Sequence, residues 1–289
     1  MPIAPQLPQI KYVNHNGDSI ILMGDNLTYI DVDPLRSFEW SYVLSNSVSG
    51  MGGRATSFSR RPRVIPLEIR MRGFNRAQAI AQFNRLQAIT ETDCIAEEPG
   101  RLYVGNQYLV CYLAVASSVT SALMVTNFVI REVQCLVTEP YWCTEDTTVF
   151  NIASHDELDT TGKKYNFKYP YRYGSGYTTG EIVNAHYAPC PAVITIYGPC
   201  ENPTAIIAGT TINVDVQLTS SDRLVIDQTS HQIYTLNVYG QKTNVFNARN
   251  KQYDIFRKIP VGRSNVLYDG SFKMVVTLIR QRSELEWTV

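Results

Sequence analysis

The sequence predicts a mainly β protein of two domains: a β-rich N-terminal domain with one helix, and a C-terminal antiparallel β-sandwich. Apolar residues alternate with polar ones in several short runs, as in strands that bury one face. Turn-forming pairs that contain Gly, Pro, Asn or Asp separate these runs. Only one segment has helical spacing. With 289 residues, 44% of them hydrophobic and 18% charged, the chain is long enough to build two cores.

The N-terminal part opens with a predicted hairpin over residues 11–22. Its turn, 15–18, contains Asn-Gly, which supplies the positive φ angles of a tight turn. A later strand is predicted where apolar side chains occupy every second position, at Ile65, Leu67, Ile69 and Met71. Pro66 places this strand near a sheet edge or at a strand start.

One helix is predicted from Asn75 to about Thr92. Asn75 is a good N-cap, and Gln78 stands at the capping-box position three residues later. Apolar residues with helical spacing and several helix-favouring alanines follow. Two further strands are predicted at residues 109–115 and 128–138.

Residues 143–187 are predicted to form a linker arm between a domain at 1–142 and a sandwich at 188–289. Six aromatic residues fall within thirteen positions there, five of them being Tyr165, Phe167, Tyr169, Tyr171 and Tyr173. One hypothesis is a surface on which bases or sugars stack. We favour an arm whose rings pack on the flanking domains, because only two basic residues accompany the six rings.

The last third contains short predicted strands separated by turn signals. They are expected at residues 193–197, 211–218, 223–227, 233–238, 264–268 and 273–280. Ile212, Val214, Val216 and Leu218 alternate with polar residues, which indicates one buried face. Strands of this number and spacing predict a sandwich or jelly roll.

Composition argues against several functional classes. The 26 basic and 26 acidic side chains balance, whereas nucleic-acid recognition usually needs a basic excess. Residues 1–5 lack the features of a signal peptide, and no apolar run approaches the roughly 20 residues of a membrane helix, so we expect no membrane insertion. The six cysteines form no CxxC pair and are predicted to be reduced thiols, with disulfides as the minority alternative.

No motif for catalysis, a cofactor or a metal was found. The four histidines are scattered and interpreted as surface or turn residues. The glycine-rich stretch 50–57 lacks the Gly-Lys-Ser/Thr ending of a phosphate loop and is interpreted as a mobile loop. A GxSxG elbow is absent, and carboxylate pairs such as Glu284 with Glu286 would need to face each other across a cleft. We therefore predict no enzyme and no cofactor.

Arginines gather downstream of the glycine-rich stretch and on the strand that follows. They are Arg54, Arg60, Arg61, Arg63, Arg70 and Arg72. Contact with nucleic acid is one hypothesis. The favoured one is a contact with a neighbouring subunit, for which the loop 54–63 and the strand 65–72 are the candidate surfaces.

Four strings resemble a known family: PAVITIYGPCENPTAII at 191–207, TINVDVQLTSSDRLVID at 211–227, YGQKTNVFN at 239–247 and FRKIPVGRSNVLY at 256–268. This order is similar to the C-terminal β-sandwich of the distal tail proteins of long-tailed bacteriophages. The N-terminal part resembles the belt domain of that family, with the aromatic stretch 38–42, the glycine-rich loop, the strand 64–72 and one helix.

The resemblance implies a galectin-like jelly roll at the C-terminus and a homo-oligomeric ring, a hexamer, closed by the belt domains. Such a ring connects the tail tube protein to a tail-tip or tail-associated hub protein in the virion tail and is a platform for a receptor-binding protein. Two alternatives remain open. One is a carbohydrate-binding β-sandwich module for host adsorption, and the other is a cell-wall hydrolase, against which the missing triad and metal ligands argue.

Overall fold

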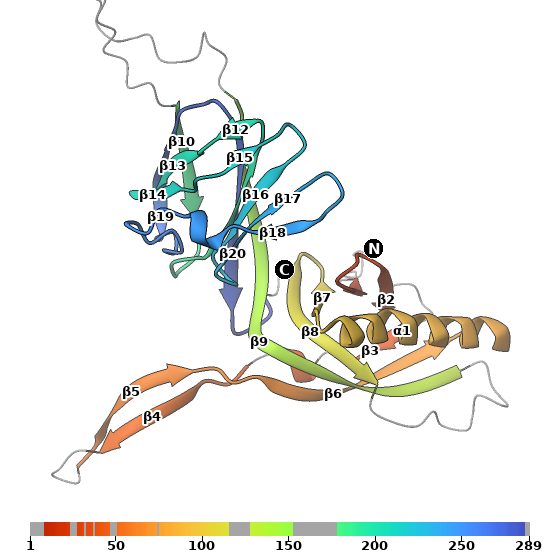
Figure 1. The fold of residues 1–289 in the computed structure, drawn as a ribbon. Coiled ribbons are helices and arrows are strands. Elements are labelled where there is room, and N and C mark those ends of the chain that lie inside the picture. Colours follow the sequence, from red (N-terminus) through yellow and green to blue (C-terminus); the bar gives the residue numbers. More distant parts are fainter. Residues whose placement is uncertain are drawn as a thin grey trace, which may run out of the picture. The chain divides into compact units, whose positions relative to one another are not determined.

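The computed structural model describes residues 9–23, 28–31, 33–36, 38–46, 51–73, 75–115, 128–152 and 178–286. The chain divides into two compact units (Figure 1). Unit 1 comprises Met1–Thr144 and Gln281–Val289, and unit 2 comprises Glu145–Arg280. Strands dominate both units, and the described residues contain a single α-helix, so the predicted mainly β fold class is confirmed.

Unit 1 is built on an antiparallel sheet whose strands follow the order β2-β1-β7-β8-β9-β6-β3. The bounds are β1 (Ile10–Val13), β2 (Ser19–Met23), β3 (Thr28–Ile30), β6 (Arg63–Arg72), β7 (Gly100–Val104), β8 (Gln107–Val115) and β9 (Phe128–Phe150). The predicted hairpin is confirmed as β1 and β2, and the alternating run at 65–71 lies in β6 with its apolar side chains buried. The predicted strand at 128–138 is longer than expected, because β9 continues to Phe150.

The helix α1 (Arg76–Ala96) packs against β8, β2 and β6 of unit 1. Its predicted N-cap is confirmed, since the Asn75 side chain accepts a hydrogen bond from the Gln78 backbone N–H at 2.8 Å. The predicted end near Thr92 was wrong by one turn. Asp93 is buried and bonded to distant strands, which holds the last turn in place until Glu97 adopts a left-handed conformation with φ 56°.

The core of unit 1 is closed by segments far apart in the sequence. A short 3₁₀ turn, η1 (Asp33–Leu35), lies over Trp142, whose indole N–H donates to the Leu35 carbonyl at 2.8 Å. Near the C-terminus, Leu285 joins the same core, and its backbone N–H donates to the Arg36 carbonyl at 3.0 Å. The chain therefore returns to unit 1 after it has completed unit 2.

Replacing Trp142 by phenylalanine should lower the free energy of unfolding of unit 1 by about 1–3 kcal/mol, because the Leu35 carbonyl loses its donor and a gap opens in the core. Trp142 is only 1% exposed. Chemical denaturation checks this, with Trp40→Phe as the control because Trp40 is 50% exposed. Equal midpoints for the two variants would contradict the prediction.

A two-stranded arm, β4 (Ser41–Asn46) and β5 (Gly53–Ser59), extends from unit 1 before β6 (Figure 1). Every residue of β5 is exposed, and so is every residue of β4 after Ser41. This corrects the interpretation of the glycine-rich stretch as a mobile loop for residues 53–57, which lie in β5. Gly52, with φ 80°, precedes the strand, and the residues from Gly53 onward pair with β4. The strand had no alternating pattern to predict it, because neither of its faces is buried.

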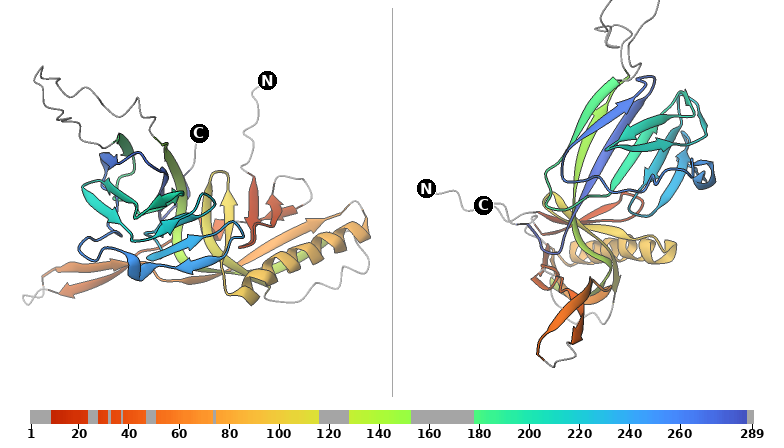
Figure 2. Two further views of the ribbon diagram at one scale, coloured as in Figure 1. Left: turned by 45° about the horizontal axis from the view of Figure 1, so that its top comes forward. Right: turned by 90° about the vertical axis from the view of Figure 1, so that its left-hand side faces the viewer.

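Unit 2 is an antiparallel sandwich of two main sheets (Figure 2). One sheet has the order β18-β17-β16-β11-β20 followed by the end of β9, and the other has the order β10-β19-β13-β14. The bounds are β10 (Thr178–Asn184), β11 (Ala192–Tyr197), β13 (Thr204–Ile207), β14 (Thr210–Asn213), β16 (Arg223–Asp227), β17 (Gln232–Leu236), β18 (Lys242–Asn244), β19 (Gly262–Tyr268) and β20 (Lys273–Arg282). The two sheets bury a common core, so the predicted sandwich is confirmed.

Two features of unit 2 differ from the sequence predictions. The single strand predicted at 211–218 is divided between β14 and the short β15 (Gln217–Leu218), which pairs with β12 (Cys200–Glu201). A tight turn separates the two, in which the Val216 N–H donates to the Val214 carbonyl at 3.0 Å. The alternation was real, since Ile212, Val214 and Leu218 all point into the core, but the chain changes sheets midway.

The segment expected to be a linker contributes to unit 2 where it is described. β10 occupies residues 178–184 of the predicted arm, ahead of the predicted boundary at 188, and residues 281–286 pack in unit 1. His186, interpreted from sequence as a surface or turn histidine, is instead buried next to β10. Its backbone N–H donates to the side-chain oxygen of Asn184 at 3.0 Å.

Candidate assembly surface

The arm formed by β4 and β5 exposes large apolar side chains that have no core of their own to enter. Tyr42, Val43, Leu44 and Phe58 are each between 58% and 63% exposed. An isolated two-stranded hairpin is only marginally stable in water, and both of its edges present unpaired backbone groups. Large exposed apolar side chains gathered on one element, among them Tyr42 and Phe58 directly opposite each other, mark an interaction site.

The base of the arm is fixed by an arginine between two aromatic rings. The Arg60 guanidinium carbon lies 3.9 Å from the centroid of the Trp40 ring and 4.9 Å from that of Tyr141. Its Nη1 donates to the Pro140 carbonyl at 3.4 Å. Phe58 packs edge-on to Trp40, with 6.4 Å between the ring centroids. The arm therefore leaves unit 1 in a defined direction, which lowers the entropic cost of docking it.

The structure separates the predicted interface arginines into two groups. Arg54 lies on the arm, and Arg61 and Arg63 lie where the arm joins β6; all three are exposed and have no ion pair within the described residues. Arg70 and Arg72 lie at the far end of β6, about 20 Å or more from Arg63 at the usual rise of a strand. Arg70 pairs with Glu68 at 2.5 Å, which raises its pKa. Arg60 belongs to neither group, because its guanidinium lies between the Trp40 and Tyr141 rings at the base of the arm.

The interface role of these arginines stays a prediction. The aromatic residues predicted to pack along the linker arm, Tyr165, Phe167, Tyr169, Tyr171 and Tyr173, lie outside the described residues. What sequence reasoning missed is the exposed apolar surface of the arm. The only feature of the sequence that indicated this surface was the aromatic stretch 38–42 beside a glycine-rich stretch.

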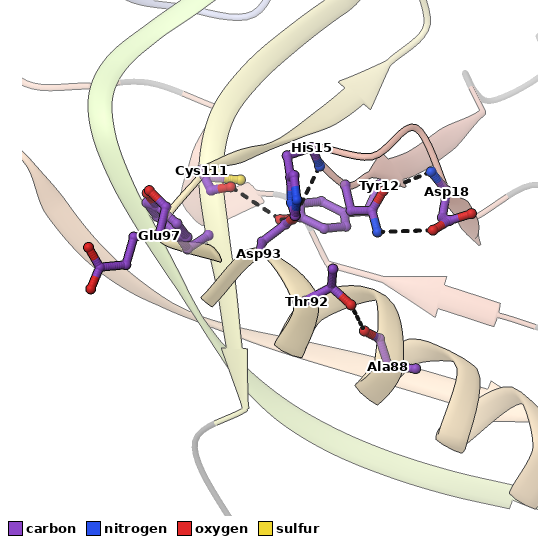
Figure 3. Close-up of polar contacts among 10 residues, drawn as sticks. Tyr12, His15, Asp18, Ala88, Thr92, Asp93, Glu97 and Cys111 are labelled. Atoms are coloured by element: carbon purple, nitrogen blue, oxygen red, sulfur yellow. Dashed lines mark hydrogen bonds and ion pairs between the residues drawn. The ribbon is translucent and has the colours of Figure 1, made fainter. Parts of the chain in front are cut away.

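A buried polar cluster in unit 1 joins α1 to the first hairpin (Figure 3). The Asp93 carboxylate, fully buried, accepts from the Tyr12 hydroxyl at 2.5 Å and from the His15 backbone N–H at 2.9 Å. It also lies 2.6 Å from the His15 ring Nδ1. Burial raises the pKa of the Tyr12 phenol well above its ordinary value, and the neighbouring Cys111 and Asp93 raise it further.

The cluster contains a His–Asp pair, as many catalytic sites do, but here the pair stabilises the fold. Both polar contacts of His15 go to Asp93, whereas a nucleophilic mechanism needs a hydroxyl or thiol on the histidine. Asp93 receives donors from two points of the first hairpin and so ties the last turn of α1 to it. His15 was interpreted from sequence as a surface or turn residue; the structure places it in the turn of the first hairpin, where its side chain is only 15% exposed and held by Asp93.

Metal binding and thiol chemistry are the other candidates in the described part of the chain. There, no group of three or more His, Cys, Asp or Glu side chains is placed to hold a metal ion. All six cysteines are free thiols, and burial raises the pKa of Cys190 and Cys200, which keeps these thiols protonated and unreactive. Within the described ranges, no helix combines the length and the hydropathy needed to cross a bilayer.

Comparison with known proteins gives matches by structure alone. No protein-family model matches the chain, and no curated protein matches its sequence. The fold is similar to that of the Dit protein of phage SPP1, described as a paradigm of the hub adsorption apparatus in phages that infect Gram-positive bacteria, with a TM-score of 0.54 and 11% identity. That match covers 95% of this chain and 98% of the other.

Chains of the phage P2 baseplate in its activated conformation are similar as well. The form with Ca gives a TM-score of 0.61 and the form with Sr gives 0.62, each at 12% identity over 96% of this chain and all of the other. These matches span both units. They confirm, at the level of the fold, the architecture that the resemblance implied.

Proposed function

We propose that this chain is a structural protein of a bacteriophage tail, a distal tail protein that closes into a hexameric ring between the tail tube and the baseplate or tail tip. The shared fold over nearly the whole chain supports this role. The observation that carries the proposal is the arm of β4 and β5, because its exposed apolar side chains need a second surface to cover them.

The ring would form by a head-to-tail contact. The arm of one copy lies on unit 1 of the next, and a rotation that closes after six copies leaves no free arm. Seven strand residues in β5 give the arm a reach of about 23 Å. Exposed Tyr, Phe and Arg side chains on and beside the arm are the types that carry binding energy at interfaces.

The proposed role is mechanical and involves no catalysis. Unit 1 supplies the ring contact, and unit 2 is a compact sandwich on which further tail proteins, such as a tail-associated hub protein or a receptor-binding protein, can assemble. The pair of residues most similar to a catalytic dyad, His15 and Asp93, is used to stabilise unit 1. The carbohydrate-binding alternative depended on residues 165–177, which lie outside the described residues, and it stays a prediction.

The purified protein should have a mass in solution six times that of the 32.6-kDa chain. Light scattering coupled to size exclusion measures this mass, and negative-stain imaging should show rings with a central hole. The catalytic alternative is checked in parallel by incubating the protein with bacterial cell walls. A monodisperse monomer at all accessible concentrations, or turnover of cell wall, would overturn the proposal.

A further inference from the structure

One row of side chains crosses the outer face of the sheet β18-β17-β16-β11-β20 in unit 2. The strand register sets its members opposite one another in the order Lys242, Leu236, Arg223, Tyr197, Lys273. Their neighbours along the strands are buried in the sandwich core, namely Leu224, Ile196 and Met274, so the row faces outward. We call these five residues the cationic row.

The cationic row carries three exposed positive charges with no acid among them. Lys242, Arg223 and Lys273 lie on alternate strands, so each cation is about 10 Å from the next across the sheet. None of the three has an ion pair within the described residues. The whole chain has zero net charge, so this excess is local.

The acids on β16 and in the turns beside the row are held by local hydrogen bonds and form no ion pair with the row within the described residues. Asp227, on the same face of β16, accepts from the Thr229 N–H and the Ser230 hydroxyl, each at 2.8 Å. Asp222, in the turn before Arg223, accepts from the Thr219 hydroxyl at 2.7 Å, which lowers its pKa. Asp269 accepts from the Ser271 hydroxyl at 2.8 Å. The neighbouring row of the face, Asn244, Tyr234, Val225, Thr195 and Val275, is uncharged.

Two tyrosine rings hold the lysines in place. Lys273 Nζ lies 5.4 Å from the centroid of the Tyr197 ring, and Lys242 Nζ lies 5.6 Å from that of Tyr234. A ring covered by an ammonium group is not free to stack on a sugar, whereas the ammonium remains available to an anion. The row is therefore suited to negatively charged groups.

An exposed tyrosine stands at one end of the row, in the turn between β17 and β18. Tyr239 is 91% exposed and its neighbour Val238 is 68% exposed. The turn is closed by the Asn237 side-chain oxygen, which accepts from the backbone N–H groups of Tyr239 and Gln241 at 3.0 and 2.9 Å. A protruding aromatic side chain on a pre-organised turn is typical of an interface anchor.

We propose that the cationic row and Tyr239 bind an acidic polypeptide segment of a partner protein. Its carboxylates would pair with the three cations, and its apolar side chains would contact Tyr239, Val238 and Leu236. A polypeptide is favoured over a polyanionic sugar because the surface combines few charges with apolar side chains. The proposal does not depend on the ring, whose contacts are assigned to unit 1.

The probe is a fluorescein-labelled peptide in which glutamates alternate with leucine and glycine, measured by anisotropy at low salt. The charge-reversal variant Arg223→Glu, Lys242→Glu, Lys273→Glu should bind it at least about tenfold more weakly than the native protein, since three pairings become repulsions. Tyr239→Ala should weaken binding about fivefold or more. Binding by the native protein should also fall as salt rises to about 0.15 M.

A matched control makes the same change of net charge on another exposed part of unit 2: Lys251→Glu, Arg257→Glu, Lys258→Glu. This variant should lose much less binding than the charge-reversal variant of the row, because none of its three charges belongs to the row and only long-range attraction changes. The variant Arg223→Lys, Lys242→Arg, Lys273→Arg should keep binding and shows that the site tolerates substitution. Equal thermal unfolding of all variants establishes that each is folded.

Three results would overturn the proposal. Equal losses in the charge-reversal variant and its control would show unspecific attraction. If the native protein does not bind the acidic peptide, the cationic row is not a site for an acidic polypeptide. Binding of alginate, an anionic polysaccharide, in place of the peptide would assign the surface to a glycan. None of these outcomes bears on the mass of the ring, so the failure of one proposal is distinguishable from the failure of the other.

Discussion

Replacing Asp93 by alanine should lower the free energy of unfolding of unit 1 by about 3–5 kcal/mol. The carboxylate is fully buried and accepts from the Tyr12 hydroxyl and the His15 backbone N–H. Its removal leaves the His15 backbone N–H without its acceptor and the Tyr12 hydroxyl with only the longer contact to the Cys111 carbonyl at 3.2 Å, and the last turn of α1 loses its tie to the first hairpin. The loss therefore exceeds the value of any single exposed ion pair.

Tryptophan fluorescence in a urea titration measures this loss, since Trp40 and Trp142, the two tryptophans among the described residues, belong to unit 1. Tyr12→Phe removes one donor of the cluster and should cost about 1–2 kcal/mol, because Asp93 keeps its contacts with His15. Thr92→Ala is the matched control. Its hydroxyl bonds only the Ala88 carbonyl one turn back, on the exposed side of α1, and the change should cost less than about 1 kcal/mol. An Asp93→Ala midpoint equal to that of the control would contradict the structural role of the cluster.

The elements predicted well from the sequence are those that bury one face. The strand at 65–71 and the start of α1 depend on local patterns, an alternation of period two and an N-cap, which leave a direct trace in the sequence. The sandwich followed in the same way from its short alternating runs. In each case the residues that define the element are neighbours in the chain.

The features that were missed depend on contacts between distant residues or on a surface that is not buried. Asp93 followed the predicted end of the helix and was not singled out, because its partners Tyr12 and His15 are 81 and 78 positions away. The division of 211–218 between two sheets left the alternation intact and so left no sign in the sequence. The arm has no buried face, and its strands carry no periodicity to predict. The arginines could be identified, but their separation into two groups required the geometry of β6.

Charged substitutions on the arm of β4 and β5 should have the second large effect, which is on the oligomeric state. The double variant Val43→Asp, Leu44→Asp should dissociate the proposed ring into single chains at concentrations where the native ring is intact. Both side chains are 58% exposed in the single chain and would be buried in the ring. Two carboxylates placed in that contact lose their water, and the weakening per contact should be about 4 kcal/mol, or a factor of roughly a thousand. Sedimentation velocity measures the change.

The stability of unit 1 should hardly change in this variant, within about 0.5 kcal/mol, because neither side chain belongs to its core. This distinguishes a lost contact from a lost fold. The control Val183→Asp, Val261→Asp alters two valines of unit 2 that are 50% and 52% exposed, and it should sediment as the native ring. Arg61→Glu tests the arginines more cleanly than a change at Arg60, since Arg60 holds the base of the arm between Trp40 and Tyr141. If the arm variant sediments like the native oligomer, the apolar surface of β4 is not what joins the subunits, and the ring contact has to be sought at the other end of β6.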